Sequence, residues 1–209
     1  MPAAVENDVR TAALGEHWKG AARGVNDFVF LALGTGIAAG IFANGKLIRG
    51  VNHTAGEVGY LYVPGAGEEP AKRRAPGSLE SVIGGHGIRQ QWLEACSAET
   101  QPRNLAATEI FERASTGDPL AKGVLDRSAQ FLAYAVYNIS LVLNSSLFVL
   151  GGGVGTSRPL RDATERILER YAEPARPKLI ISSLGADAQL MGAIRLAMTT
   201  AERRSKIRA

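Results

Sequence analysis

The stretch that decides the fold is DFVFLALGTG, at residues 27–36. Phe28 to Leu33 is rich in strand-forming residues and runs directly into Gly34-Thr35-Gly36, which predicts a buried strand ending in a tight turn. In residues 37–48, Asn44-Gly45 separates two further apolar runs. Asn-Gly in that position is a strong hairpin signal, so the first third of the chain is expected to form antiparallel strands.

The rest of the chain extends this sheet. Val58 to Val63 is a further strand candidate, and the Pro/Gly-rich residues 64–77 are expected to form a loop. A strand, a helix, a strand and a helix then alternate over residues 147–199, which predicts parallel strands with crossover helices. The helices outside this alternation are expected at Val9 to Trp18, Leu79 to Val82, Ile88 to Cys96, Ala107 to Ala114 and Pro119 to Leu143. The predicted fold class is therefore α/β, with a mixed β-sheet flanked by helices.

The composition is that of a folded protein, with 45% apolar and 21% charged residues in 209. The net charge is +4, but most basic residues are scattered among acids, which favours an ordinary solvated surface over a nucleic-acid groove. Two basic clusters, Lys72-Arg73-Arg74 and Arg203 to Arg208, are interpreted as loop and tail. A single cysteine, Cys96, and the lack of a secretion signal favour a cytoplasmic protein. The uncharged residues 128–157 contain polar side chains and end at a glycine triplet, so a buried helix and strand are favoured over a membrane span.

Two glycine-rich turns follow predicted buried strands. Gly34-Thr35-Gly36 lets backbone N–H groups approach an anion, although glycines at a strand end more often form only a plain turn. Gly151-Gly152-Gly153 precedes Thr156 or Ser157 as a helix cap, with Pro159 in the first turn. Such a joint leaves room for a nucleotide, or serves only close packing of helix on sheet.

Several acids and amides are candidates for chemistry on a polyol. Asp8 at a helix start would be kept ionised by the helix dipole, as a general base requires, although an aspartate there is more often only a cap. Asn52, Glu57 and Glu80 flank apolar or glycine-rich segments and could present acceptors to hydroxyl groups. Each of them alone is more often a surface residue.

The order of these motifs resembles the ROK family (repressor, open reading frame, kinase) over nearly the whole chain. The motifs are Glu6-Asn7-Asp8, Leu33 to Gly36, Asn52 to Glu57, Glu80, Leu150 to Gly153 and Leu184 to Ala188. The resemblance implies a ribonuclease-H-like lobe of the actin-like ATPase fold and a homodimer. It also implies that residues 1–209 are the C-terminal lobe of such a protein.

The resemblance assigns roles to individual residues. Asp8 would be the base that activates a sugar hydroxyl for attack on the γ-phosphate of ATP. The sugar would be bound by Asn7, Asp8, Asn52, Glu57, Tyr60 and Glu80. The nucleotide would be bound by Gly34, Thr35, Gly36, Gly151, Gly152 and Gly153. ATP and Mg²⁺ are therefore expected only if the protein is a kinase.

The sequence departs from the family pattern in three ways. The Asp-x-Gly-Gly-Thr phosphate motif of an N-terminal lobe does not occur, and Met1 lies only a few residues before Asp8. Tyr60 stands where the family has a zinc-binding histidine, and the following loop lacks the family's cysteines, so no zinc is expected; His53 and His86 are not at the metal position. Ala38 and Ala39 replace glycines, with methyl groups expected beside the nucleotide.

Three hypotheses follow. The favoured one is the sugar-binding effector domain of a ROK transcriptional regulator, without kinase activity, which would contact DNA only through an N-terminal domain absent from this sequence. The alternative is an ATP-dependent, glucokinase-like hexose kinase whose N-terminal lobe is not included. The third is a non-functional remnant that associates through an exposed apolar interface.

Overall fold

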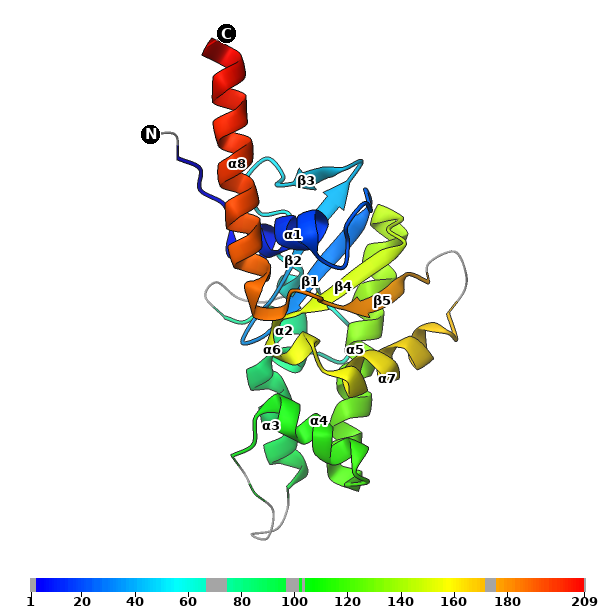
Figure 1. Cartoon of the computed structure of the whole chain (residues 1–209). Helices are drawn as coiled ribbons and strands as arrows, with labels where there is room; N and C mark the ends of the chain where they lie inside the picture. Colours follow the sequence, from blue (N-terminus) through cyan, green and yellow to red (C-terminus); the bar gives the residue numbers. More distant parts are fainter. Residues whose placement is uncertain (1–2, 67–74, 97–101, 103, 172–175, 209) are drawn as a thin grey trace.

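A mixed five-stranded sheet forms the centre of the computed structural model, which describes residues 3–66, 75–96, 102, 104–171 and 176–208 (Figure 1). The strand order is β3-β2-β1-β4-β5. The strands are β1 (Phe28–Leu33), β2 (Ile37–Ala43), β3 (Lys46–Ile48), β4 (Leu147–Gly151) and β5 (Lys178–Ile181). The first three are antiparallel, whereas β4 and β5 run parallel to β1. The predicted mixed sheet is therefore confirmed.

The turns and caps explain where these elements begin and end. Asn44 and Gly45 both have positive φ, 52° and 70°, as the predicted hairpin between β2 and β3 requires. The Asn7 side chain caps α1 (Asp8–Lys19), and Ser157 caps α7 (Arg158–Leu168) with Pro159 in the first turn. Asn144, in the left-handed conformation, ends the long helix α5 (Pro119–Leu143).

Alternate residues of the central strands serve two separate cores. Val29, Leu31 and Leu33 of β1 face a large core shared with α2 (Ser78–Ile83), α3 (Gly85–Ala95), α4 (Ala107–Ser115), α5 and α7. Phe28 and Phe30 face a smaller core with α1 and the start of α8 (Ala188–Arg208). Because successive side chains of a strand point to opposite faces, one continuous apolar run supplies both cores.

Small residues bring α1 close to its neighbours. A Cβ on Gly40 of β2 would lie 2.4 Å from the Ala13 methyl group, and one on Gly192 of α8 would lie 1.7 Å from the carbonyl oxygen of Thr11. The helix that carries Asp8 is thus held directly on the sheet and against α8. Figure 1 shows α8 continuing beyond this contact, away from the body of the molecule.

Several sequence predictions are corrected here. Residues 58–63 are not a strand: Val58–Tyr60 forms a short 3₁₀ helix, η1, in which the Leu61 N–H donates to the Val58 carbonyl at 3.0 Å. Val58, Gly59 and Val63 are buried and residues 60–62 exposed, which is not the alternation of a strand. The expected basic tail belongs to α8, which reaches Arg208. Lys72-Arg73-Arg74 and most of the predicted loop lie outside the described residues.

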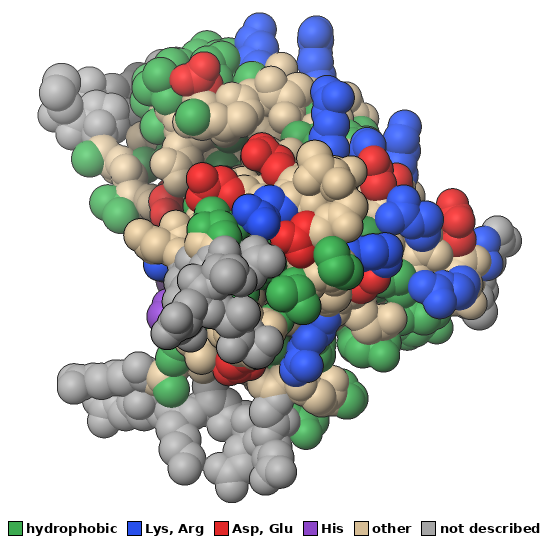
Figure 2. All heavy atoms as spheres, turned by 90° about the horizontal axis from the view of Figure 1, so that it is seen from below, with side chains coloured by type: hydrophobic (Ala, Val, Ile, Leu, Met, Phe, Trp, Pro, Cys, Tyr) green, Lys and Arg blue, Asp and Glu red, His purple; other side chains and the backbone are tan. Residues whose placement is uncertain are grey.

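The surface and the apolar segments agree with the remaining predictions. On the face shown in Figure 2, Lys and Arg side chains are interspersed with Asp and Glu. The uncharged residues 128–157 form the end of α5, the buried strand β4 and the short helix α6 (Gly152–Gly155). Within the described residues, no helix has the length and apolar character needed to cross a membrane.

Candidate functional site

Asp8 is the first residue of α1, where the preceding cap leaves its carboxylate accessible. Asn7 Oδ1 accepts the N–H groups of Val9 at 3.0 Å and Arg10 at 3.2 Å, so Asn7 supplies the helix cap. Asp8 Oδ1 accepts only the Val9 N–H, at 2.8 Å, and no described residue donates to Oδ2. The cap is therefore Asn7, and Asp8 keeps an oxygen free to accept a proton from a ligand.

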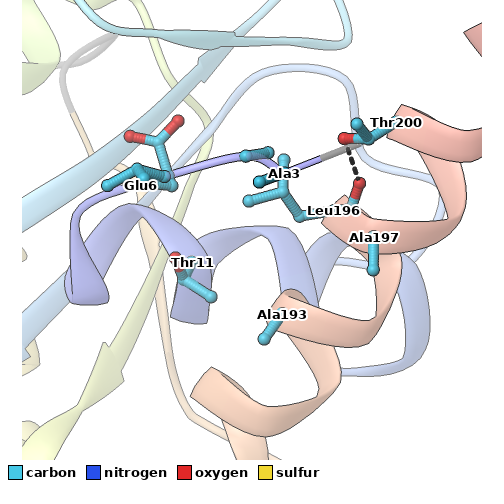
Figure 3. A pocket seen from close by; sticks show the side chains of 9 residues that line it. Ala3, Glu6, Thr11, Ala193, Leu196, Ala197 and Thr200 are labelled. Atoms are coloured by element: carbon cyan, nitrogen blue, oxygen red, sulfur yellow. Dashed lines mark hydrogen bonds between the residues drawn. The ribbon is translucent and has the colours of Figure 1, made fainter. Parts of the chain in front are cut away.

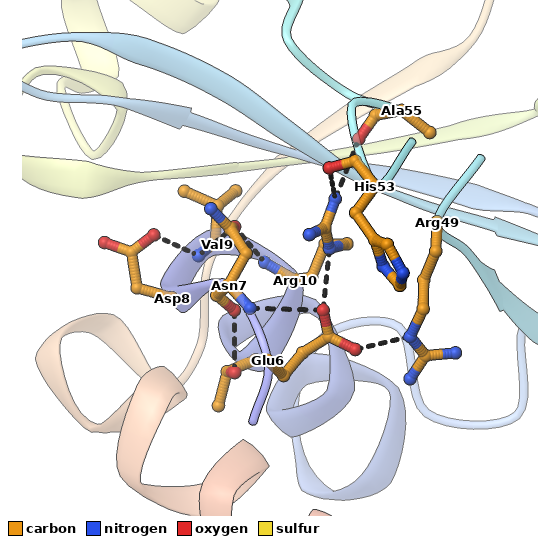
Figure 4. Close-up of polar contacts among 9 residues, drawn as sticks. Glu6, Asn7, Asp8, Val9, Arg10, Arg49, His53 and Ala55 are labelled. Carbon is orange, nitrogen blue, oxygen red and sulfur yellow. Dashed lines mark hydrogen bonds and ion pairs between the residues drawn. The ribbon is translucent and has the colours of Figure 1, made fainter. Parts of the chain in front are cut away.

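A buried ion-pair network lies directly before Asp8 (Figure 4). The Glu6 side chain is 4% exposed, and its two oxygens accept hydrogen bonds from Arg10 Nε at 2.8 Å and Arg49 Nε at 2.6 Å. Arg10, itself 7% exposed, also donates to the carbonyl oxygens of His53 at 3.0 Å and Ala55 at 3.3 Å. Both oxygens of the buried Glu6 carboxylate are thus paired with a cation, as burial of charge requires, whereas the Arg49 side chain is 41% exposed.

The network determines the protonation state of Glu6. Burial alone would raise the pKa of this carboxyl, but hydrogen bonds from Arg10, the Asn7 N–H and Arg49, with the charge of Arg49, outweigh it. The pKa of Glu6 is therefore held below its ordinary value of 4.5. Glu6 stays ionised at neutral pH and serves as a fixed anchor for the two arginines.

This network joins the 52–57 loop, which carries Asn52 and Glu57 as predicted sugar-binding residues, to α1. Arg10 holds the loop by donating to two of the loop's carbonyl oxygens. These lie in sequence between Asn52 and Glu57, which are both exposed. On the other side, the Ala39 N–H of β2 donates to the Gly56 carbonyl at 2.7 Å, and a Cβ on Gly56 would lie 1.9 Å from the Ala39 oxygen. Gly56 has φ +93°, a conformation for which glycine is suited.

Ala38 and Ala39 lie in the sheet, contrary to the expectation that their methyl groups crowd the nucleotide. They pair with Ala32 and Leu31 of β1, and Ala39 is 2% exposed within the larger core. The reason is that the turn ends at Gly36, so that β2 has already begun at Ile37. The Ala39 methyl group therefore packs in the core.

Glu80, on α2, stands between the first glycine turn and η1. Its Oε2 accepts the Ile37 N–H at 2.9 Å, and a Cβ on Gly36 would lie 2.6 Å from that oxygen. A Cβ on Gly59 of η1 would lie 3.2 Å from the same atom. Glu80 therefore supports the turn through one oxygen and has the other available, and its contact with sugar stays a prediction.

The five glycines among the residues predicted to bind the nucleotide divide into two kinds. Gly36, Gly151 and Gly152 serve packing: a Cβ on Gly151 would lie 2.4 Å from the Phe30 ring, and one on Gly152, at φ +80°, would lie 2.3 Å from the Leu33 carbonyl oxygen. Gly34 and Gly153 have nothing within 4 Å of a Cβ position. Within the triple glycine, Gly151 and Gly152 therefore serve close packing, and nucleotide binding at Gly153 stays a prediction.

Gly34, Thr35 and Gly153 line a common cavity of about 580 Å³. The Gly85 N–H, at the start of α3, donates to the Gly34 carbonyl at 2.8 Å and so joins α3 to the turn. The remaining wall comes from α3 and the start of α4, with His86, Arg89 and Thr108 as its polar residues. The volume is in the range of small-molecule and cofactor sites.

A second cavity, of about 500 Å³, lies between the N-terminal segment and α8 (Figure 3). It is lined mainly by alanines, with Glu6 and Thr11 on one side and Leu196 and Thr200 on the other. The Thr200 hydroxyl donates to the Leu196 carbonyl within its own helix at 2.8 Å. None of the predicted sugar or nucleotide residues lines this cavity.

The sequence model of the ROK family matches residues 1–200. This chain belongs to the ROK family. A glucokinase from Halalkalibacterium halodurans is 34% identical over 207 residues, which cover 92% of this chain and 62% of the relative. The chain thus spans less than two thirds of that ROK enzyme.

Two solved ROK structures share the fold. A ROK glucokinase from Streptomyces griseus, in complex with glucose and AMPPNP, superposes with a TM-score of 0.80 at 26% identity, over 94% of this chain and 68% of its own. A ROK transcriptional regulator, a homologue of the E. coli MLC protein, superposes with a TM-score of 0.76 at 26% identity, over 90% of this chain and 50% of its own. The actin-like, ROK-type fold predicted from the motifs is therefore confirmed.

Sequence reasoning missed the charged residues that hold the ROK motifs in place. Arg10, Arg49 and Arg89 were not singled out, and neither was Glu16, whose side chain is fully buried. The i, i+4 spacing of Glu6 and Arg10 was the one available signal, because it is typical of a helical ion pair. Tyr60 is 57% exposed, and no group of three potential metal ligands occurs among the described residues. The absence of zinc stays a prediction.

Proposed function

We propose that this chain supplies the sugar site, the catalytic base and part of the nucleotide site of an ATP-dependent ROK sugar kinase. The observation that carries the proposal is the cavity shared by Gly34, Thr35 and Gly153, residues from two distant turns. Open Cβ positions at both glycines expose the backbone to a ligand. The 34% identity to a glucokinase favours the kinase over the effector domain, which the missing metal motif and the altered glycine turn had favoured.

In the proposed reaction, Asp8 Oδ2 accepts the proton of a sugar hydroxyl. The hydroxyl oxygen forms a bond to the γ-phosphorus of ATP, the bond from phosphorus to the β,γ-bridging oxygen breaks, and ADP leaves with that electron pair. Asn7, Asn52 and Glu57 orient the sugar, and Gly34 and Thr35 bind phosphate oxygens. Mg²⁺ would be bound mainly through the phosphates and would neutralise the developing charge. Catalysis of this kind depends chiefly on positioning.

The test measures binding and turnover separately. Calorimetry with hexoses and N-acetylhexosamines, with and without Mg-ATP, is combined with an assay for sugar-dependent release of ADP. We expect sugar and nucleotide to bind, and Asp8→Asn to retain binding while losing turnover at least ~100-fold, the range of a missing general base. Turnover that survives Asp8→Asn would contradict the assigned base.

A sugar-responsive regulator is the second candidate. Tyr60 in place of the implied histidine favours it, as does the similarity to the regulator homologous to MLC. Sugar binding without nucleotide binding or turnover would support the regulator and contradict the kinase. The identity of the sugar, homodimer formation, a cytoplasmic location and the position of this chain at the C-terminal end of a longer ROK protein stay predictions.

A further inference from the structure

The cavity lined by Gly34, Thr35 and Gly153, where the nucleotide is proposed to bind, has an uneven distribution of charge. Among the described residues that line it, Arg89 is the only permanently charged side chain, and none is acidic. The other polar contributors are Thr35, His86 and Thr108. A cavity with one cation and no carboxylate suits a ligand that carries phosphates or an electron-rich ring.

The position of Arg89 on α3 separates it from the phosphate turn. α3 begins at Gly85, which is bonded to Gly34 of the turn. Arg89 lies four residues further along, about 6 Å at the rise of an α-helix. Its Nη2 donates to Asn104 Oδ1 at 2.9 Å, in the segment that leads into α4. The guanidinium is thus held on the α4 side of the cavity.

We propose that Arg89 binds the nucleoside end of the nucleotide, with its guanidinium plane stacked on the adenine base. The inference rests on the proposed nucleotide site and deepens it. A nucleotide whose phosphates occupy the Gly34-Thr35 turn extends its base along the cavity toward α4. Asn104 engages the guanidinium at one edge, through Nη2, which leaves its face available to a ring.

The chemistry of arginine fits this role. A guanidinium is planar and delocalised and stacks on aromatic rings, whereas the ammonium of lysine is a compact point charge. Stacking contributes to the binding of any purine and does not depend on the number of phosphates. A contact between Arg89 and a phosphate would behave in the opposite way. A lysine could make the same contact, and the contribution of the contact to affinity would grow with the negative charge of the ligand.

The experiment compares adenosine with ADP in titrations of the full chain. We expect Arg89→Ala to weaken both ligands by the same factor, ~10-fold, which corresponds to the contribution of one stacked base. Arg89→Lys should weaken them nearly as much, since it keeps the charge but loses the plane. Asn104→Ala should have a smaller effect in the same direction. Arg127→Ala is the matched control, because Arg127 lies over Phe131 on α5 and should leave both affinities unchanged.

The outcomes distinguish this inference from the proposed function. Three outcomes would overturn the inference but not the proposed function. They are wild-type affinity of Arg89→Ala for both adenosine and ADP, wild-type affinity of Arg89→Lys for both ligands, and a loss of affinity in Arg89→Ala that is confined to ADP. A wild-type chain that binds glucose but neither adenosine nor ADP would overturn the nucleotide site as well. Circular dichroism of each variant shows that the fold is retained.

Discussion

The two ends of the proposed site are built in different ways. On the α1 side, buried charges hold the backbone: Glu6 binds two arginines before the helix, and Glu16 binds three donors near its end. On the α3 and α6 side, glycines allow backbone segments to touch, as Gly152 does against Leu33.

The two arrangements place different constraints on the amino acids that make them. The ion-pair network holds the 52–57 loop through the carbonyl groups of His53 and Ala55, so this contact does not depend on which side chains the two residues carry. A glycine contact fixes the backbone itself, and the residue that makes it cannot change. The Arg10 contact is therefore expected to survive substitution of His53 or Ala55 side chains, whereas Gly56 in the same loop and the packing glycines Gly151 and Gly152 should tolerate little.

The largest effect is expected at Glu16. Its fully buried carboxylate accepts the Ala21 N–H at 2.6 Å, the Leu184 N–H at 3.2 Å and the Ser182 hydroxyl. Glu16→Ala leaves these part-buried donors without their partner and opens a cavity at a fully buried side chain, and we expect the free energy of unfolding to fall by about 4 kcal/mol. Urea denaturation checks this, with exposed Glu94→Ala as the control. A loss below 1 kcal/mol would show that buried charge is not what holds α1.

The next effect is expected at Gly152. An alanine there combines left-handed strain with a methyl group 2.3 Å from a backbone oxygen, so we expect a loss of about 3 kcal/mol. Gly117→Ala isolates the strain, because Gly117 has φ +96° with nothing within 4 Å of its Cβ position. It should lose about 1 kcal/mol. Equal losses in the two variants would remove the steric part of the argument.

A third prediction concerns Glu6 and pH. Glu6→Gln removes the negative charge between Arg10 and Arg49, and we expect about 2 kcal/mol less stability at neutral pH. Because the folded state lowers the pKa of Glu6, its contribution is complete above the ordinary value of 4.5 and is lost as the pH falls below it. The stability difference between wild type and variant should therefore shrink in acid. A difference that stays constant from pH 7 to pH 3 would contradict this linkage.

The smallest effect on stability is expected at Gly153. Its Cβ position is open, so Gly153→Ala should change the free energy of unfolding by less than about 0.5 kcal/mol. The added methyl group narrows the nucleotide cavity, and the affinity for ADP should fall while that for sugar stays the same. Unchanged ADP affinity, measured by calorimetry, would place the nucleotide elsewhere.

The pattern of the sequence predicted the sheet well, for a physical reason. Phe28 to Leu33 and Leu147 to Leu150 are buried on both faces, so their apolar runs are continuous and unmistakable. Residues 58–63 show the limit of this reasoning. Their valine and tyrosine residues are typical of a strand, but whether the backbone finds a strand partner depends on distant segments, and here it forms a 3₁₀ helix.

The sequence by itself determined the family, the order of the motifs and the strands that carry them, because these depend on local residue types and their spacing. Only the tertiary structure decided which glycines face the cavity and which ones serve packing. It also decided that Glu6 and Arg10 hold the 52–57 loop and that Arg89 lines the same cavity as Gly34 and Gly153. These roles depend on contacts across 40 or more residues of chain or between separate helices, and the spacing of residues along the sequence carries no information about such contacts.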